Sequence, residues 1–229
     1  MRLSIFLFDG FTTLDAVGGY EVLSRVPKIE TEFFAKDPAL IAADTRRLGL
    51  AAWKGFSDVI ETDILYVPGG PGVEHAKKDP AVLQKLRDLD ATSTWTVGIC
   101  NGVDLLGAAG LITNRDVTTN FFHRAPVAKK YGANIKPVRF HRDEKYITGA
   151  GVSASIETGL FLTTLIAGER TAKTLQLGIE YYPAPQYLES KPEDAPDYSK
   201  KAIDAFEERG GVEQLRQEPP FKGLFTVNA

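Results

Sequence analysis

The 229-residue chain contains a single cysteine, Cys100, and this scarcity limits what the protein can be. One thiol can form neither an internal disulfide nor a metal site built from several thiolates. A long hydrophobic run is also missing, because Asp9 and Gly10 interrupt the apolar stretch near the N-terminus, which shows no signal-peptide cleavage pattern. We therefore expect a protein of the reducing cytoplasm that does not insert into a membrane.

An excess of positive charge is likewise missing. The chain has 27 Lys and Arg residues against 30 Asp and Glu, a formal net charge of -3, which argues against a broad basic surface for nucleic acid. Hydrophobic residues make up 43% of the chain, enough for a sizeable buried core. A globular protein whose partner is a small molecule, and not a nucleic acid, fits this composition.

Short apolar runs alternate with amphipathic segments along most of the chain. The apolar runs predict strands over residues 2–8, 63–70 and 94–100, with weaker candidates at 31–36, 48–53 and 117–120, and a hairpin over 138–151. The segments between them predict helices over residues 14–24, 79–90, 103–111, 125–131 and 155–167. This alternation predicts one α/β domain with a mainly parallel sheet flanked by helices.

The C-terminal part of the chain differs from the rest in composition. Residues 1–185 carry the α/β pattern, whereas residues 186–229 are rich in proline and charge and contain one polar helical segment near 198–209. We expect this tail and its helix to pack either on the same domain or on the partner of a dimer.

Cys100 lies in the pattern Gly98-x-Cys100-x-Gly102, at the end of a predicted strand and just before a predicted helix. Ligands of parallel α/β sheets bind beyond the carboxyl ends of the strands, and this spacing is typical of a nucleophile elbow. The dipole of the following helix would favour the thiolate and lower the pKa of the thiol. The alternative is an inert cysteine of the core.

A nucleophilic cysteine needs a partner that moves protons. The three histidines, His75, His123 and His141, are each interpreted as surface or capping residues. Asp15 is the better candidate, because it begins the first helix directly after the first strand, although a helix-capping role would also place it there. A buried carboxyl beside a thiolate keeps its proton and could pass it to a substrate.

A glycine turn follows the strand that ends in "VPGGPG", residues 67–72. Amides at Gly70 and around Pro71 could form an oxyanion hole, and a simple tight turn is the alternative. The second glycine-rich segment, "GAGVSAS" at residues 149–155, lacks the lysine and the spacing of a nucleotide-phosphate loop, which excludes that kind of site.

These segments resemble, in order and over nearly the whole chain, the DJ-1/PfpI superfamily. The resemblance is carried by "LDAVGGYEVL", "ILYVPGGPGV", "VGICNGVDLLGAAGLITNRDVTTN" and "ITGAGVSASIETGLFL". Within the superfamily the chain is most similar to isocyanide hydratases, because its acidic residue is an aspartate and because "LQLGIEYYPAPQY" precedes a proline-rich tail. The residue after the cysteine departs from the hydratase pattern: it is Asn101 in place of threonine. Asn120 stands where many relatives have the histidine of "TTHW".

The resemblance implies an enzyme that adds water to an isocyanide and gives an N-substituted formamide. Cys100 would form a covalent thioimidate, and Asp15 would act as general acid and base, with neither a metal nor an organic cofactor. Asn101 would bond to substrate, water or Asp15. A homodimer is also implied. Strand-end positions add Ser153 and Phe121 to Gly70 and Pro71 as candidate pocket residues.

Other functions remain open on the sequence alone. A glyoxalase acting on 2-oxoaldehydes belongs to the same superfamily but normally has a glutamate and a nearby histidine. A redox or stress sensor would oxidise Cys100 without turning over a substrate. A protease is less well supported, because the chain offers no convincing triad.

Overall fold

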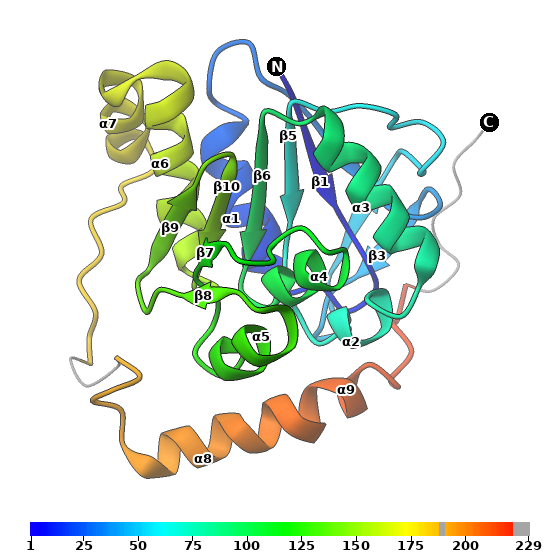
Figure 1. Ribbon diagram of the computed structural model, residues 1–229, viewed down its shortest axis with the longest axis vertical. Helices are drawn as coiled ribbons and strands as arrows, with labels where there is room; N and C mark the ends of the chain where they lie inside the picture. The colour runs from blue at the N-terminus through cyan, green and yellow to red at the C-terminus, as the bar shows by residue number, and fades with distance from the viewer. Residues whose placement is uncertain (188–190, 222–229) are drawn as a thin grey trace.

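A six-stranded sheet forms the centre of the computed structural model, which describes residues 1–187 and 191–221 (Figure 1). The strand order is β2-β1-β5-β6-β10-β9; the first five strands run parallel and β9 is antiparallel to β10. The strands are β1 (Arg2–Phe6), β2 (Glu30–Phe34), β5 (Ile64–Val67), β6 (Trp95–Ile99), β9 (Phe140–Asp143) and β10 (Tyr146–Gly149). The predicted α/β fold with a mainly parallel sheet is confirmed.

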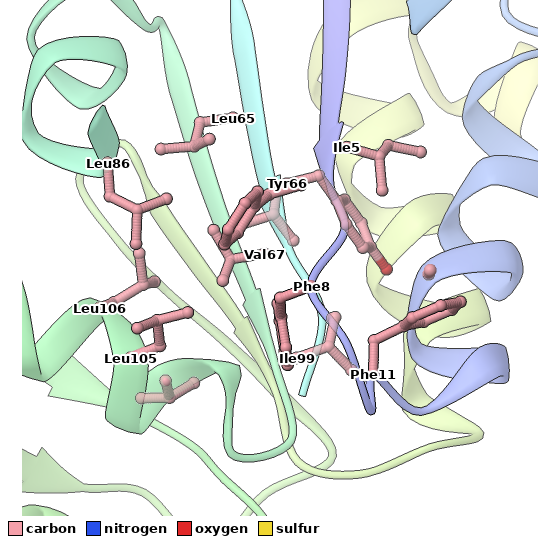
Figure 2. Close-up of a cluster of buried hydrophobic side chains, with 14 of the residues drawn as sticks. Ile5, Phe8, Phe11, Leu65, Tyr66, Val67, Leu86, Ile99, Leu105 and Leu106 are labelled. Atoms are coloured by element: carbon pink, nitrogen blue, oxygen red, sulfur yellow. The ribbon is translucent and has the colours of Figure 1, made fainter. Parts of the chain in front are cut away.

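Helices cover both faces of this sheet (Figures 1 and 2). One face carries α1 (Thr13–Leu23) and α6 (Ala154–Ala167), which pack against each other, and the other carries α3 (Pro80–Thr92) and α4 (Gly102–Ala108). Three further helices lie around these, α2 (Val73–Ala76), α5 (Arg124–Tyr131) and α7 (Glu169–Gly178).

The core fills both sides of the central strands. Ile5 and the Tyr66 ring point toward α1, whereas Leu65 points toward Leu86 of α3 and Leu106 of α4 (Figure 2). Side chains alternate between the faces of a strand, so a strand covered on both faces is a continuous apolar run. This is why β1 and β5 were predictable from the sequence. Because the two strands are parallel neighbours, the start of α1 and the glycine turn that follow them lie at one edge of the sheet.

Two of the weaker predicted strands differ in the structure, one in its pairing and the other in its length. The strand expected at 48–53 is β4 (Gly49–Ala52), but it pairs with β3 (Ala39–Ala42) outside the main sheet. The strand expected at 117–120 is only β7 (Asp116–Val117), paired with β8 (Asn134–Ile135). It ends early because the Thr118 amide donates to Thr148 Oγ1 (2.9 Å) and Thr119 Oγ1 donates to the Cys100 carbonyl (2.7 Å).

The C-terminal arm, residues 197–214, lies across the carboxyl ends of the parallel strands (Figure 1). It consists of α8 (Asp197–Ala205), a π-helical turn η2 (Phe206–Gly210) and α9 (Gly211–Gln214), so the single helix expected near 198–209 continues beyond that range. In this chain the arm packs on its own domain: Gly211 lies on Pro71, and just beyond the arm the Gln217 carbonyl accepts from Arg46 Nε (2.9 Å).

Among the described residues, no helix is both long and apolar enough to cross a membrane.

Candidate active site

Cys100 occupies a sharp turn between β6 and α4. Its φ of 55° lies in the left-handed region, which is costly for a residue with a side chain. The turn is held because the Cys100 amide donates to the Gly149 carbonyl (2.9 Å). A Cβ at Gly98 would lie 2.7 Å from Leu106, and one at Gly102 would lie 2.5 Å from the Val67 carbonyl oxygen. Gly102 is therefore required by the close approach of the backbone, whereas a side chain at Gly98 would have to displace the buried Leu106.

The Cys100 side chain is 8% exposed and faces a cavity of about 550 Å³ at the carboxyl ends of the strands. The domain contributes Gly70, Asn101 and His123 to its wall, and the C-terminal arm contributes Phe206 and Glu207. The arm thus roofs the cysteine, a role that the sequence did not reveal.

Asp15 lies fully buried at the start of α1, beside Cys100. The Gly69 amide donates to Oδ2 (2.9 Å), while Oδ1 is buried with no hydrogen bond of normal geometry from the described residues. Burial, with a smaller contribution from the Asp44 and Glu207 charges, raises the pKa of this carboxyl from 3.8 to about 7, against the opposing effects of the Gly69 amide and the Cys100 thiol. A carboxyl with such a pKa exchanges its proton near neutral pH.

The prediction that helix α4 lowers the thiol pKa is wrong. Burial and the negative charge of Asp15 raise the pKa of Cys100 well above its usual range, more than the Asn101 amide and the Asn120 side chain lower it. A helix of only seven residues, α4, is outweighed by the loss of solvent around the sulfur. Of the two coupled groups, the carboxyl ionises before the thiol.

The Asn101 side chain pairs with the Gly70 backbone. The Gly70 amide donates to Asn101 Oδ1 (2.6 Å), and Asn101 Nδ2 donates to the Gly70 carbonyl (3.0 Å). These two bonds use the Gly70 N–H, which is therefore not available to an oxyanion, whereas the second N–H of Asn101 Nδ2 takes part in neither bond. The Asn101 side chain fixes the glycine turn, which also places Pro71 in the cavity wall. The backbone N–H of Asn101 is a donor directed at the Cys100 sulfur.

Asn120 contacts the nucleophile directly. The sequence had shown only that Asn120 replaces a histidine found in many relatives. Its Nδ2 donates to Cys100 Sγ (3.0 Å), and its Oδ1 accepts from the His123 backbone N–H (3.0 Å). Because a backbone N–H can only donate, Oδ1 must face His123 and the NH₂ group must face the sulfur. His123 Nδ1 lies 2.7 Å from the same Oδ1, so the imidazole reaches the cysteine through Asn120.

The other candidate residues lie apart from the sulfur. Phe121 packs on Phe122, with ring centroids 3.9 Å apart, and exposed Ser153 accepts from Arg139 Nη2 (2.9 Å). Neither is among the described residues that line the cavity. His75 lies exposed at the cavity wall, and His141 lies on β9, near Asp116. In the described part of the chain no group of three or more His, Cys, Asp or Glu side chains is arranged to hold a metal ion.

The fold and site define an α/β protein in which a cysteine on a strand-to-helix turn faces a buried carboxyl. Residues 1–165 match the DJ-1/PfpI family, and the chain belongs to that family. It is 32% identical to isonitrile hydratase of Pseudomonas putida over 86% of this chain and 85% of that protein. It is also 27% identical to an uncharacterised protein of Streptomyces lividans, over 56% of this chain and 94% of that one.

Solved structures agree with this assignment. The crystal structure of a ThiJ/PfpI family protein from Pseudomonas syringae is similar with a TM-score of 0.86 and 25% identity, covering 94% of this chain and 90% of that one. DJ-1beta of Drosophila melanogaster matches with a TM-score of 0.70 and 17% identity, over 78% of this chain and 97% of that one, and shows the fold alone.

Proposed function

We propose that the protein is an isocyanide hydratase in which Cys100 is the nucleophile and Asp15 carries the protons. The observation that carries the proposal is the under-bonded, fully buried Asp15 carboxyl beside the chain's single cysteine. The similarity to isonitrile hydratase over 86% of the chain supports the choice of substrate class. The expected partner is a small molecule. We also propose that the protein is a homodimer, as its resemblance to the DJ-1/PfpI superfamily implies.

The first half of the reaction forms the covalent intermediate. The Asp15 carboxylate takes the thiol proton while Cys100 Sγ attacks the terminal isocyanide carbon and forms the carbon–sulfur bond. The carbon then receives that proton from Asp15, which gives a thioimidate with a C=N bond. The Asn120 NH₂ group and the Asn101 amide stabilise the charge on sulfur before attack.

The second half releases the product. Water adds to the thioimidate carbon while the Asp15 carboxylate takes one of its protons, and that proton passes to nitrogen. The Asp15 carboxylate then takes the hydroxyl proton and passes it to sulfur as the carbon–sulfur bond breaks, which gives the formamide and regenerates the Cys100 thiol. The sum is one water added to one isocyanide, without an external oxidant or reductant.

The direct test is formamide formation from an aryl isocyanide such as p-nitrophenyl isocyanide. Wild type should turn over, and Cys100→Ala should not while remaining as stable to urea as wild type. Absence of formamide with wild type, or equal formation by the variant, would contradict the proposal. Conversion of methylglyoxal in its place would indicate a glyoxalase, and oxidation of Cys100 with no turnover of either compound would indicate a sensor.

A further inference from the structure

Three carboxylates in the wall of the cavity at Cys100 form no ion pair with a residue that the structure describes. Asp44 lines it from the domain, and Glu207 and Glu208 line it from the C-terminal arm. Asp44 accepts from Thr12 Oγ1 and from the Thr45 amide, each at 2.7 Å, and none of the three carboxylates forms an ion pair with a described residue.

The field of these carboxylates reaches the reacting groups. The Glu207 charge contributes to raising the pKa of both Asp15 and Cys100, and the Asp44 charge contributes at Asp15. Asp15 adds a further carboxyl beside the sulfur, and its buried Oδ1 accepts no hydrogen bond from residues 1–187 and 191–221. Charges that face a partly closed cavity act at lower dielectric than charges on an open surface.

Positive charge at the same cavity is weaker. Burial lowers the pKa of His123, which keeps its imidazole neutral, and His75 and Lys78 are exposed. The remaining acidic residue of the wall, Glu74, is paired with Lys77, which also lies 2.7 Å from Asp104. Glu208 is exposed like His75 and Lys78, so the acidic groups of the half-buried wall are Asp44 and Glu207.

We propose that these carboxylates make the cavity selective for charge: it admits neutral and cationic small molecules to Cys100 and rejects anionic ones. The substrate class rests on the proposed hydratase function: it is an isocyanide without a carboxylate or phosphate group, and an isocyanide bearing an amine is favoured. Charge selection at Cys100 does not itself depend on the reaction.

The single cysteine allows charge selection to be measured without any substrate. Rate constants are determined for modification of Cys100 by a cationic trimethylammonium and an anionic sulfonate methanethiosulfonate, with intact mass as readout. In each case the thiolate forms a mixed disulfide and displaces methanesulfinate. The cationic-to-anionic ratio is divided by the same ratio for 2-mercaptoethanol, at about pH 8, above the pKa of about 7 of Asp15.

We expect a normalised ratio on the order of tenfold or more for wild type. Glu207→Gln should lower it several-fold, and Asp44→Asn, on the domain rather than on the arm, should lower it independently of how the arm packs. Glu213→Gln makes the same change of charge on the same arm, at an exposed position outside the cavity wall, and should leave the ratio unchanged.

A normalised ratio near one, or a ratio that neither Glu207→Gln nor Asp44→Asn lowers, would overturn the proposal. The outcome is separable from that of the formamide assay. Charge selection without formamide formation would remove the hydratase function alone, and formamide formation without charge selection would remove this inference alone.

Discussion

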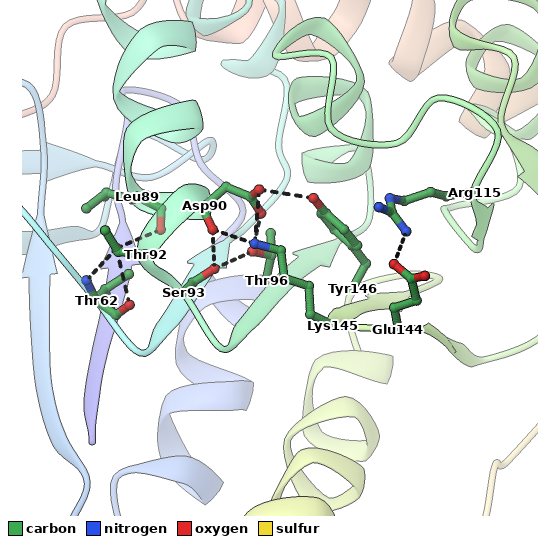
Figure 3. A network of polar contacts seen from close by, with 10 residues as sticks. All are labelled: Thr62, Leu89, Asp90, Thr92, Ser93, Thr96, Arg115, Glu144, Lys145 and Tyr146. Carbon is green, nitrogen blue, oxygen red and sulfur yellow. Dashed lines mark hydrogen bonds and ion pairs between the residues drawn. The ribbon is translucent and has the colours of Figure 1, made fainter.

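Two buried aspartates lie at opposite ends of the same sheet, and their surroundings differ in the number of partners. At the amino end, Asp90 accepts from Thr96 Oγ1 (2.6 Å) and Tyr146 Oη (3.0 Å), and Lys145 Nζ lies 3.1 Å from it (Figure 3). At the carboxyl end, Asp15 accepts from the Gly69 amide and lies beside the Cys100 thiol, and its Oδ1 has no hydrogen-bond donor among the described residues. A satisfied buried carboxyl stabilises the fold, whereas an unsatisfied one is free to exchange a proton.

The largest expected effect comes from removing the acid at the carboxyl end. Asp15→Asn keeps an acceptor for the Gly69 amide but cannot carry a proton, so kcat/KM for isocyanide hydration should fall by about 10²–10⁴-fold. Steady-state kinetics of formamide formation measure this. A loss below about threefold would show that Asp15 is only a structural residue.

The same substitution should alter stability in a way that depends on pH. The Asp15 carboxyl has its pKa raised from 3.8 to about 7, so the folded state holds a proton that the unfolded state releases. Below about pH 4 the carboxyl is protonated in both states and does not destabilise the folded protein. As the pH rises toward 7 the free energy of unfolding falls, and above that the full destabilisation is reached. Asp15→Asn should therefore be more stable than wild type by roughly 2–4 kcal/mol at about pH 8 and equal to it at low pH. Urea unfolding at several pH values measures the difference; a variant less stable than wild type at pH 8 would contradict it.

At the amino end the prediction is reversed. Asp90→Ala leaves Thr96, Tyr146 and Lys145 without their shared acceptor and should cost about 2–3 kcal/mol of unfolding free energy. Because the cavity lies at the other end of the strands, formamide formation per folded molecule should stay within about twofold of wild type. A large loss of turnover in the folded variant would show that the two ends are coupled.

The smallest effect concerns the donor that faces the sulfur. Asn120→Ala removes the Nδ2 hydrogen bond to Cys100 Sγ, which should raise the thiol pKa and slow alkylation by neutral iodoacetamide about 3–10-fold. Ser153→Ala is the matched control, because the structure places Ser153 outside the cavity wall, and it should react at the wild-type rate. Equal rates for the two variants would remove Asn120 from the account.

Much of the fold and part of the site could be predicted from the sequence, for a physical reason. Strands β1, β5 and β6 are buried on both faces, so each leaves an apolar run, and the close packing around the turn at Cys100 requires small residues that leave the G-x-C-x-G pattern. Asp15 was predictable because the carboxyl ends of parallel strands share one edge of the sheet.

The features that were missed depend on contacts between residues far apart in the chain. The two hydrogen bonds between Asn101 and Gly70 join positions 31 residues apart. Only the three-dimensional structure shows that they use the Gly70 N–H, which was expected to bind an oxyanion. Glu207 lies in the cavity wall on an arm for which the sequence predicted a helix near 198–209 but no contact with the cysteine site. The direction of the Cys100 pKa shift was mispredicted because burial, which the motif does not show, outweighs the dipole of a short helix.

The most direct test of the coupled Asp15–Cys100 pair is a pH titration of the thiolate by its ultraviolet absorbance, with Cys100→Ala as the blank. Since Cys100 is the only cysteine, the signal has a single source. The account predicts that the thiolate of Asp15→Asn appears at lower pH than that of wild type, because the neighbouring negative charge has been removed. A thiolate that appears at the same or higher pH in the variant would show that the two groups do not share charge, and the proposed proton transfer between them would fall.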